Sequence, residues 1–264
     1  MYQFGFIGMG NMGSAMLKGC LSVFPASTLA FSRKDAVKGK ALSLETGAVW
    51  IDSNRACAEQ SRYIILAVKP QFYDGVLKEI QPVLDDSRII ISLAPSYTIA
   101  NLKQALGASV RIVRAMPNTP AMVGEGMTGL SWSEDVFSDT ERQELMQFFT
   151  SFGKAETVPE NLMDAVTAAS GSSPAFIYMM IEALADGVVK YGMPRDKAYT
   201  FVAQAVLGSA KMVLETGEHP GVLKDKVCSP GGTTIAAVAA LEASAFRSSL
   251  IEAASAVCER CRNM

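Results

Sequence analysis

Three glycines near the start of the chain, Gly8, Gly10 and Gly13, have the spacing G-x-G-x-x-G and directly follow an apolar run. Between a strand and a helix, the first glycine allows a tight turn, the second lets the backbone approach a pyrophosphate and the third lets the helix pack on the sheet. Residues 14–18 suit a helix, whose unpaired first-turn amides would face the phosphates. We predict a dinucleotide site formed by Ile7, Gly8, Met9, Gly10, Asn11 and Met12.

The end of the second expected strand indicates which dinucleotide is bound. An Asp or Glu about twenty residues after the glycines would hold the ribose hydroxyls of NAD, but residues 29–34 end in Ser32, Arg33 and Lys34. A hydroxyl and two cations suit a 2′-phosphate, because they form charge-assisted hydrogen bonds. We predict NADPH as the cofactor, with NADH as the weaker alternative. Two alternatives stay open: the cations are ordinary surface charges, or Asp35 is a displaced acid.

A second segment that can bind a ligand lies late in the chain and reads Cys228-Ser229-Pro230-Gly231-Gly232-Thr233-Thr234-Ile235. It is a proline–glycine loop that opens into an apolar helix. Backbone amides of Gly232, Thr233 and Thr234 at the helix N-terminus can hold a carboxylate without an arginine, and a threonine hydroxyl adds a further bond. A threonine N-cap behind a flexible loop explains the same residues equally well.

Two other reactive residue types carry weaker signals. The chain has one histidine, His219, which precedes Pro220 without a visible acid partner, so we predict a structural hydrogen bond for it rather than a role as general acid. The five cysteines are scattered, and Cys258 and Cys261 form a C-x-x-C without a second pair. We therefore expect neither a disulfide framework nor a metal site.

A parallel sheet in the first half of the chain must position the cofactor. Short apolar runs at 62–68, 89–93 and 110–114 indicate buried strands, and helical patterns at 71–84 and 99–106 separate them, which is βαβ organisation. Ligands bind outside the carboxyl ends of such strands. We expect three segments that follow strands to line the cleft: Ala67-Val68-Lys69-Pro70, Ala94-Pro95-Ser96 and Met116-Pro117-Asn118-Thr119-Pro120.

Helical patterns dominate after about Pro159, where the strand signal disappears. They cover 162–170, 176–191, 196–215, 223–227, 235–243 and 245–262, and the segment 171–174 interrupts the first two. Many of these helices are apolar on more than one face, which is more than a small monomeric bundle would bury. We predict an α/β protein with a Rossmann-type dinucleotide-binding domain, 1–159, and an all-helical domain, 160–264, that binds substrate and forms a homodimer. A larger self-contained core is the alternative.

The composition argues against several classes of partner. A formal net charge of −2 provides no basic field for nucleic acid. The first residues form a strand pattern without a basic and apolar leader, and the charge-free segment 165–181 is interrupted and short for a membrane span. We expect a cytoplasmic protein that acts on a small molecule, with neither nucleic acid nor a membrane as its partner.

The segment 223–235, continuing to Leu241 and Glu242, closely resembles the signature of the pyrroline-5-carboxylate reductases. The similarity extends along essentially the whole chain, through 6–12, 67–70, 116–120, 164–167, 170–175 and 219–220. The chain departs from the family at Ser173, where family members often have a glycine before the proline. The resemblance implies NAD(P)H-dependent reduction of the cyclic imine L-1-pyrroline-5-carboxylate to L-proline, the last step of proline biosynthesis.

The resemblance also implies roles for individual residues. It makes Thr234 the catalytic residue, which bonds the ring nitrogen, and it places the substrate carboxylate at the amides near Gly232 and Thr233. The predicted substrate-binding set is Ser229, Pro230, Gly231, Gly232, Thr233 and Thr234. Asn54 joins the residues around the adenosine phosphate, and Lys69, Pro70 and Asn118 border the nicotinamide. Besides residues 7–12, the predicted cofactor-binding set is Ser32, Arg33, Lys34, Asn54, Ala67, Val68, Lys69, Pro70, Ala94 and Asn118.

Two other functions compete with this interpretation. A 3-hydroxyacid dehydrogenase shares the two-domain plan but relies on a lysine on the first long helix after the cleft, and no lysine occurs between Lys154 and Lys190. A non-catalytic NADP-sensing module would bind the cofactor and signal to a partner through its helical half. The intact loop 229–234 favours catalysis, because a sensor has no use for a carboxylate clamp.

The resemblance to the pyrroline-5-carboxylate reductases also bears on the oligomeric state, since related enzymes often form larger rings of dimers.

Overall fold

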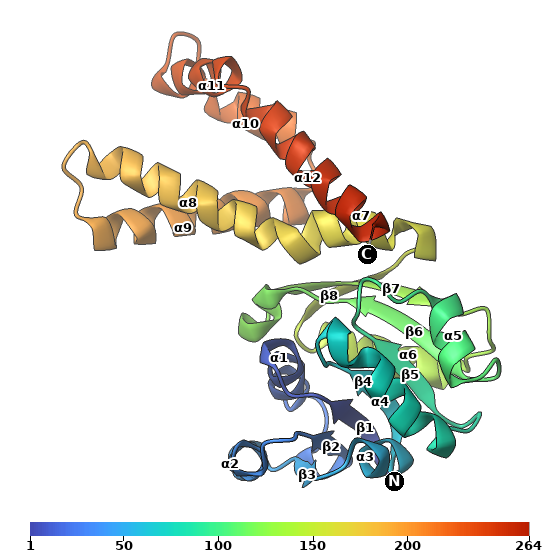
Figure 1. Ribbon diagram of the computed structural model, residues 1–264. Helices are drawn as coiled ribbons and strands as arrows, with labels where there is room; N and C mark the ends of the chain where they lie inside the picture. Colours follow the sequence, from blue (N-terminus) through green and yellow to red (C-terminus); the bar gives the residue numbers. More distant parts are fainter. Residues whose placement is uncertain (264) are drawn as a thin grey trace. The chain divides into compact units, whose positions relative to one another are not determined.

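The computed structural model describes residues 1–263, which fold into two compact units (Figure 1). The first unit contains residues 1–172 together with the chain from Val257 onward, and the second unit contains Ser173–Ala256. The compact division thus follows Ser172. The predicted domain boundary between residues 159 and 160 stays a prediction.

An eight-stranded sheet forms the centre of the first unit, in the order β3-β2-β1-β4-β5-β6-β7-β8. Its strands are β1 (Tyr2–Ile7), β2 (Leu29–Ser32), β3 (Val49–Ile51), β4 (Ser61–Leu66), β5 (Ile89–Ser92), β6 (Arg111–Met116), β7 (Gly126–Trp132) and β8 (Gly153–Thr157). The first six are parallel, whereas β7 is antiparallel to β6. The strand order 3-2-1-4-5-6 is that of a dinucleotide-binding fold, which confirms the predicted fold class.

Helices cover both faces of this sheet. They are α1 (Asn11–Cys20), α2 (Ala36–Thr46), α3 (Asn54–Glu59), α4 (Tyr73–Ile80), α5 (Ile99–Leu106), α6 (Asp139–Thr150) and α7 (Met163–Val166). Successive strand side chains point to opposite faces, so Phe4 and Phe6 join one buried cluster and Ile7 joins the other. Burial on both faces explains why these strands are short apolar runs without alternation.

Three strands, β3, β7 and β8, are absent from the sequence-based assignment. β3 has three residues, and β8 is an edge strand with the exposed charges Lys154 and Glu156. β7 and β8 approach closely at two glycines, because a Cβ on Gly153 would lie 2.0 Å from the carbonyl oxygen of Gly126. Glycines and charges lower the strand signal of a sequence. The predicted runs also differ from the observed strands at their ends: β4 stops at Leu66 and β6 continues to Met116.

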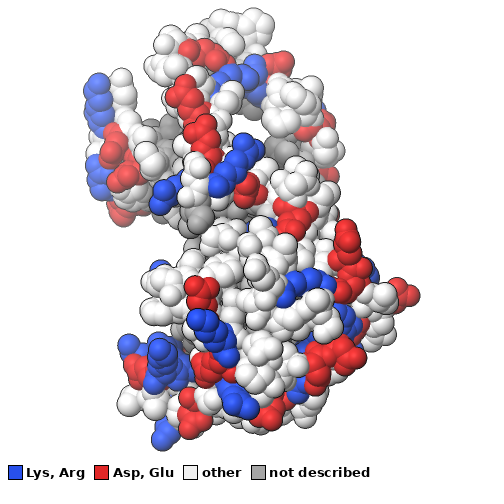
Figure 2. Space-filling model, turned by 45° about the vertical axis from the view of Figure 1, so that its right-hand side comes forward, with Lys and Arg blue, Asp and Glu red and all other residues white. Residues whose placement is uncertain are grey.

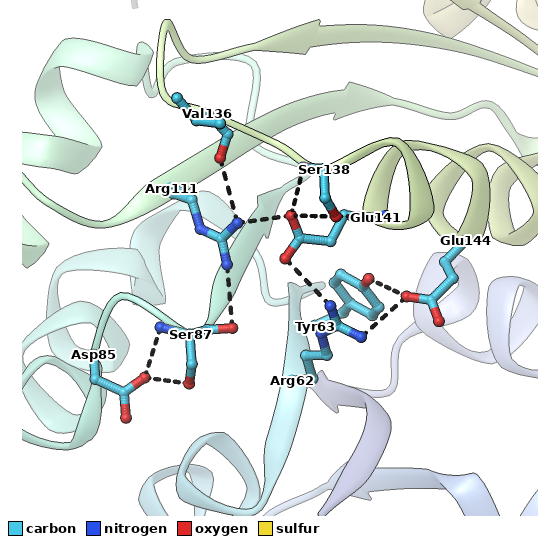
Figure 3. A network of polar contacts seen from close by, with 9 residues as sticks. All are labelled: Arg62, Tyr63, Asp85, Ser87, Arg111, Val136, Ser138, Glu141 and Glu144. Carbon is cyan, nitrogen blue, oxygen red and sulfur yellow. Dashed lines mark hydrogen bonds and ion pairs between the residues drawn. The ribbon is translucent and has the colours of Figure 1, made fainter.

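A network of ion pairs fixes α6 to the sheet (Figure 3). The Glu141 carboxylate accepts hydrogen bonds from Arg111 on β6 at 2.8 Å and from Arg62 on β4 at 3.3 Å. Glu141 also forms a capping box with Ser138, the N-cap of α6. Burial by itself would raise the pKa of Glu141, but the hydrogen bonds from Arg111 and Ser138 outweigh it and lower the pKa from 4.5 to about 2.

The second unit consists of helices: α8 (Ser173–Val189), α9 (Arg195–Thr216), α10 (Pro220–Val227), α11 (Thr233–Ala243) and most of α12 (Phe246–Arg262). The predicted interruption at 171–174 is wrong. A π-helical turn, Thr167–Ser172, leads directly into α8. Its wider hydrogen-bonding register accommodates the glycine and serines, and Pro174 lies in the first turn of α8, where a proline is tolerated.

The second unit buries almost none of its own apolar side chains. Within residues 173–256, only Ala185 and Ala198 are buried. Large apolar residues such as Tyr178, Met179 and Phe201 are exposed on α8 and α9. An apolar groove of 720 Å³ lies along these two helices and is lined by residues that include Leu184, Phe201 and Val206. The second unit therefore has no core of its own. The alternative that the sequence left open, a larger self-contained core, is not observed within residues 173–256.

Figure 2 shows acidic and basic side chains interspersed on the visible face. Within residues 1–263 no single helix has the length and apolar character to cross a membrane, and the pair α11 and α12 meets those two criteria only jointly, with a bend of 51° between them. The cytoplasmic location stays a prediction.

Candidate cofactor and substrate sites

The glycine motif forms the predicted turn between β1 and α1. Gly8 has φ +93°, and a Cβ there would lie 2.6 Å from the side chain of Val68. A Cβ on Gly13 would lie 2.6 Å from the carbonyl oxygen of Gly8, so this glycine lets α1 approach the turn. The space beside Gly10 is open, with no atom within 4 Å of an added Cβ. Gly10 is also the N-cap of α1 and no side chain caps this helix, so its first amides are available to an anion.

Two adjoining cavities start at this turn. The first has a volume of 590 Å³ and is lined by Gly8, Gly10, Asn11, Met12, Ala67, Val68, Lys69, Pro70, Phe72, Leu93, Pro117 and Thr119. The second has a volume of 410 Å³ and is lined by Gly8, Ser32, Arg33, Lys34, Asn54, Val68, Gln71, Phe72, Gly75, Val76 and Glu79. Because Gly8, Val68 and Phe72 line both, the two cavities form one cleft at the carboxyl ends of β1, β2 and β4.

The outer part of the cleft suits a phosphorylated ribose. Arg33 and Lys34 line it directly. The alternative acid Asp35 is engaged elsewhere, because it caps α2 and accepts a hydrogen bond from the Lys38 amide at 3.0 Å. That hydrogen bond lowers the pKa of Asp35. Asp35 therefore has a structural role, and Arg33 and Lys34 remain the cations that follow β2 in the lining of the cleft.

An exposed aromatic ring also borders the cleft. Phe72 is 53% exposed and lines both cavities. The ammonium of Lys34 lies 5.8 Å from the centroid of its ring. A free aromatic face beside a cation can stack on a nucleobase. Phe72 thus adds an exposed aromatic ring to the wall that the two cavities share.

Four of the predicted cofactor-binding residues do not line the cleft. The side chains of Ile7, Met9 and Ala94 are buried in the two apolar clusters. Asn118 is 8% exposed, donates from Nδ2 to the Ser170 carbonyl oxygen at 3.1 Å and accepts at Oδ1 from the Met127 amide at 2.8 Å. Contacts of these four residues with a cofactor stay predictions.

Sequence reasoning missed the cleft residues that come from α4 and from the helical turn directly before it. Gln71, Phe72, Gly75, Val76 and Glu79 come from the helical segment that begins at Pro70. Phe72, Gly75, Val76 and Glu79 have the spacing i, i+3, i+4, i+7, which places them on one helix face. That spacing, directly after a strand end already assigned to the cleft, was the signal available in the sequence.

The predicted substrate loop leads into α11 with free amides. Gly231 has φ +70° and Gly232 is the N-cap of α11, with no side chain capping the helix. The threonine N-cap left open by the sequence is therefore not formed. The Gly232 amide donates to the Ser229 carbonyl oxygen at 3.0 Å. Thr233 and Thr234 occupy the first two helical positions, where amides lack intrahelical partners, so these amides are available to a ligand, and the predicted binding of a carboxylate there stays a prediction.

The remaining reactive side chains are those of the histidine and the cysteines. His219 caps α10 and its Nδ1 accepts a hydrogen bond from the Gly221 amide at 3.0 Å, which confirms the predicted structural hydrogen bond. All five cysteines are free. Within the described part of the chain, no three His, Cys, Asp or Glu residues are grouped as metal ligands would be.

The fold and the cleft are those of a dinucleotide-binding protein, and two cations, Arg33 and Lys34, line the outer pocket of the cleft. Two family models match the chain: one for NADP oxidoreductases described as coenzyme F420-dependent, over residues 3–96, and one for the dimerisation domain of pyrroline-5-carboxylate reductase, over residues 160–264.

Relatives and solved structures match over nearly the full length. A pyrroline-5-carboxylate reductase of Escherichia coli is 45% identical over 95% of this chain and 94% of its own length. The structure of a pyrroline-5-carboxylate reductase from Coxiella burnetii has a TM-score of 0.92 at 32% identity and covers 99% of this chain and 98% of its own. The Plasmodium falciparum enzyme, solved with NADP bound, has a TM-score of 0.88 at 32% identity and covers 99% and 97%. The chain belongs to the pyrroline-5-carboxylate reductase family.

Proposed function

We propose that this chain reduces L-1-pyrroline-5-carboxylate to L-proline with NADPH as the reductant. The full-length likeness to the Escherichia coli enzyme is the observation that carries this proposal. The cleft supports it independently, because its glycine turn and its pair of cations suit NADPH. Bound NADPH supplies a hydride.

Different residues of the cleft contact different parts of the dinucleotide. The open space at Gly10 and the uncapped start of α1 accommodate the pyrophosphate. Arg33 and Lys34 bind the 2′-phosphate by charge-assisted hydrogen bonds. Lys69 and Pro70 line the cavity of 590 Å³ on the side where the nicotinamide would lie. This division extends the predicted roles of these residues.

The substrate-binding residues supply two different interactions. The free amides of Thr233 and Thr234 bind the carboxylate, and the Thr234 hydroxyl bonds the ring nitrogen. The imine nitrogen arrives protonated, so the electrophile is an iminium and no strong acid is required. Hydride addition to the imine carbon converts the C=N double bond to a single bond and neutralises the nitrogen. This step fits a loop without a charged general acid.

We also propose a homodimer formed through the second unit. Its exposed apolar helices and the groove along α8 and α9 support this, because large exposed apolar patches mark interaction sites. The dimerisation family model that matches residues 160–264 supports oligomer formation in general. The mass of the assembly in solution distinguishes a dimer from a ring of several dimers.

Isotope transfer tests the proposed reaction. NADPH with deuterium at the transferable C4 position should deliver the label to C5 of the proline formed. Product analysis by mass spectrometry and NMR measures this transfer. Unlabelled proline, or no proline in the presence of bound NADPH, would contradict direct reduction of the imine.

The substitution Thr234→Ala tests the proposed catalytic residue. Loss of a hydrogen bond made in the transition state costs about 1.5–3 kcal/mol, so kcat should fall about 10- to 100-fold while the NADPH dissociation constant stays within about twofold. Thr150→Ala is the matched control, because the Thr150 hydroxyl bonds only its own helix, α6. Equal losses in turnover and NADPH binding would contradict a role at the substrate nitrogen.

A further inference from the structure

The pocket that holds Arg33 and Lys34 also contains one carboxylate among its lining residues, Glu79. The sequence lacks an acid at the end of β2, where NAD-dependent proteins place one to bind ribose hydroxyls. Glu79 comes from the last turn of α4 instead. An acid therefore reaches the adenosine pocket from a different element.

Glu79 is tied to the other polar residues of the pocket by a chain of hydrogen bonds. The Asn54 side-chain amide donates from Nδ2 to Glu79 Oε2 at 2.8 Å, and the Arg55 backbone amide donates to Oε1 at 3.4 Å. The Ser32 hydroxyl donates to Asn54 Oδ1 at 2.7 Å. Glu79 thus connects α4 to the first turn of α3 and, through Asn54, to the end of β2.

This chain fixes which groups face a ligand as donors and which as acceptors. An ionised carboxylate only accepts hydrogen bonds, so Asn54 must turn its nitrogen toward Glu79 and its oxygen toward Ser32. The Ser32 hydroxyl donates its only hydrogen to Asn54 Oδ1. Its lone pairs are therefore acceptors for a ligand, like the carboxylate of Glu79.

Acceptors in this position distinguish the two nicotinamide cofactors. The ribose of NADH carries a 2′-hydroxyl, which donates to an acceptor, whereas the 2′-phosphate of NADPH is an anion that only accepts and is repelled by a carboxylate. We propose that Glu79 is a specificity-determining residue, which supplies the acid missing after β2 and lets the pocket bind NADH beside NADPH. This inference rests on the proposed use of a nicotinamide cofactor.

Glu79 and the two cations then act in opposite directions in one pocket. Arg33 and Lys34 favour the phosphorylated ribose, and Glu79 reduces that preference. The substitution Glu79→Gln tests the charge, because glutamine keeps one oxygen that accepts from Asn54, while the charge and the second acceptor oxygen, which receives the longer hydrogen bond from the Arg55 amide, are removed. The matched control is Glu59→Gln, at the end of α3, which does not line the cleft.

Calorimetric binding tests the inference without turnover. The probes are NADPH and NADH, together with the fragments adenosine 2′,5′-bisphosphate and adenosine 5′-monophosphate. For Glu79→Gln we expect the affinity ratio of phosphorylated to unphosphorylated ligand to rise about fivefold in both pairs, the scale of one exposed charge interaction. Glu79→Asp, which keeps the charge, should restore the ratio toward that of the unaltered chain, and Glu59→Gln should leave it unchanged.

Two results would overturn the inference. Equal weakening of both members of each pair would show that Glu79 only supports the fold of α3 and α4. An unchanged ratio would show that its charge does not reach the ribose. Proline formation is measured separately, so a shifted ratio in a chain that makes no proline would leave the role of Glu79 intact and contradict the proposed reductase activity.

Discussion

The two compact units differ in how they bury apolar side chains. The first unit contains two buried clusters, one on each face of its sheet, whereas the second buries only Ala185 and Ala198 among residues 173–256. A unit with its own core can hold a cofactor pocket by itself. A unit with exposed apolar helices needs a further surface to pack against. The first unit is thus stable in its own packing, whereas the second unit depends on a surface outside itself.

A charge placed in the groove along α8 and α9 should have the largest effect of the substitutions considered. It should disrupt the association of chains through the second unit and leave cofactor binding by the first unit intact. Phe201 lines this groove and is 65% exposed. In Phe201→Asp, burial of a charge at the proposed dimer contact should weaken association by about 4 kcal/mol or more, about a thousandfold. Light scattering should then show the mass of one chain, and turnover should be lost. NADPH binding should persist, because the first unit has its own core.

The control for this prediction is Leu44→Asp. Leu44 is 88% exposed on α2 in the first unit, and a charge there should change neither mass nor turnover. A Phe201→Asp protein that keeps the mass and activity of the unaltered chain would contradict the contrast between the units.

The ion network at α6 provides the converse test. A substitution in this network should destabilise the first unit and leave the association of chains unchanged. The pKa of Glu141 falls from 4.5 to about 2 on folding. The shift corresponds to about 3 kcal/mol of stability, present above pH 4.5 and lost as the pH falls toward 2. Glu141→Gln should lower the free energy of unfolding by about this amount at pH 7, and its difference from the unaltered chain should shrink below pH 4.5.

Chemical denaturation between pH 7 and pH 3 measures this effect. Glu45→Gln is the control, because Glu45 forms an exposed ion pair with Lys18 and such pairs contribute less than about 1 kcal/mol. A pH-independent difference between Glu141→Gln and the unaltered chain would show that the Glu141 carboxylate is not held ionised by Arg111. A change in the mass of the assembly would show that the units are not independent.

A smaller effect is expected within the cofactor pocket. Replacing Arg33 and Lys34 together by glutamine should narrow the preference for NADPH over NADH about tenfold, since one charge-assisted hydrogen bond is worth roughly 1.5–3 kcal/mol. Steady-state kinetics with both cofactors measures the ratio. The double substitution of Lys38 and Lys40, exposed on the neighbouring helix α2 and outside the cleft lining, is the control. An unchanged ratio would make both cations ordinary surface charges.

Much of the lining of the candidate cofactor cleft was predictable, because short segments of the sequence supply it. The glycine motif and residues 32–34 at the end of β2 each lie within a few positions of sequence, and Ala67 to Pro70 directly follow β4. Fold geometry brings the ends of parallel strands together whatever their distance in sequence. These local patterns were therefore sufficient to place the pocket.

Glu79 illustrates what the sequence did not reveal. It lies 25 residues from Asn54, its hydrogen-bonding partner, and on a different helix. No local pattern specifies that pair, since it depends on how α3 and α4 pack. Likewise, β8 carries charges and forms an edge, and its pairing with β7 depends on close contact between Gly126 and Gly153.

The helical region was predictable in outline only. Glycine and proline mark the helix ends near 192–194 and 217–221, and those boundaries agree with α8, α9 and α10 within a few residues. The same residue types at 171–174 predicted an interruption, yet a π-helical turn continues the helix there. Glycine and proline signal a break only where no alternative hydrogen-bonding register satisfies the backbone.

The most direct test of the account is an assay of the reaction itself. NADPH oxidation is followed at neutral pH with L-1-pyrroline-5-carboxylate supplied and L-proline quantified, and NADH is measured in parallel. The account predicts one proline formed for each NADPH oxidised, with a higher kcat/KM for NADPH than for NADH. Tight NADPH binding without formation of proline would contradict it.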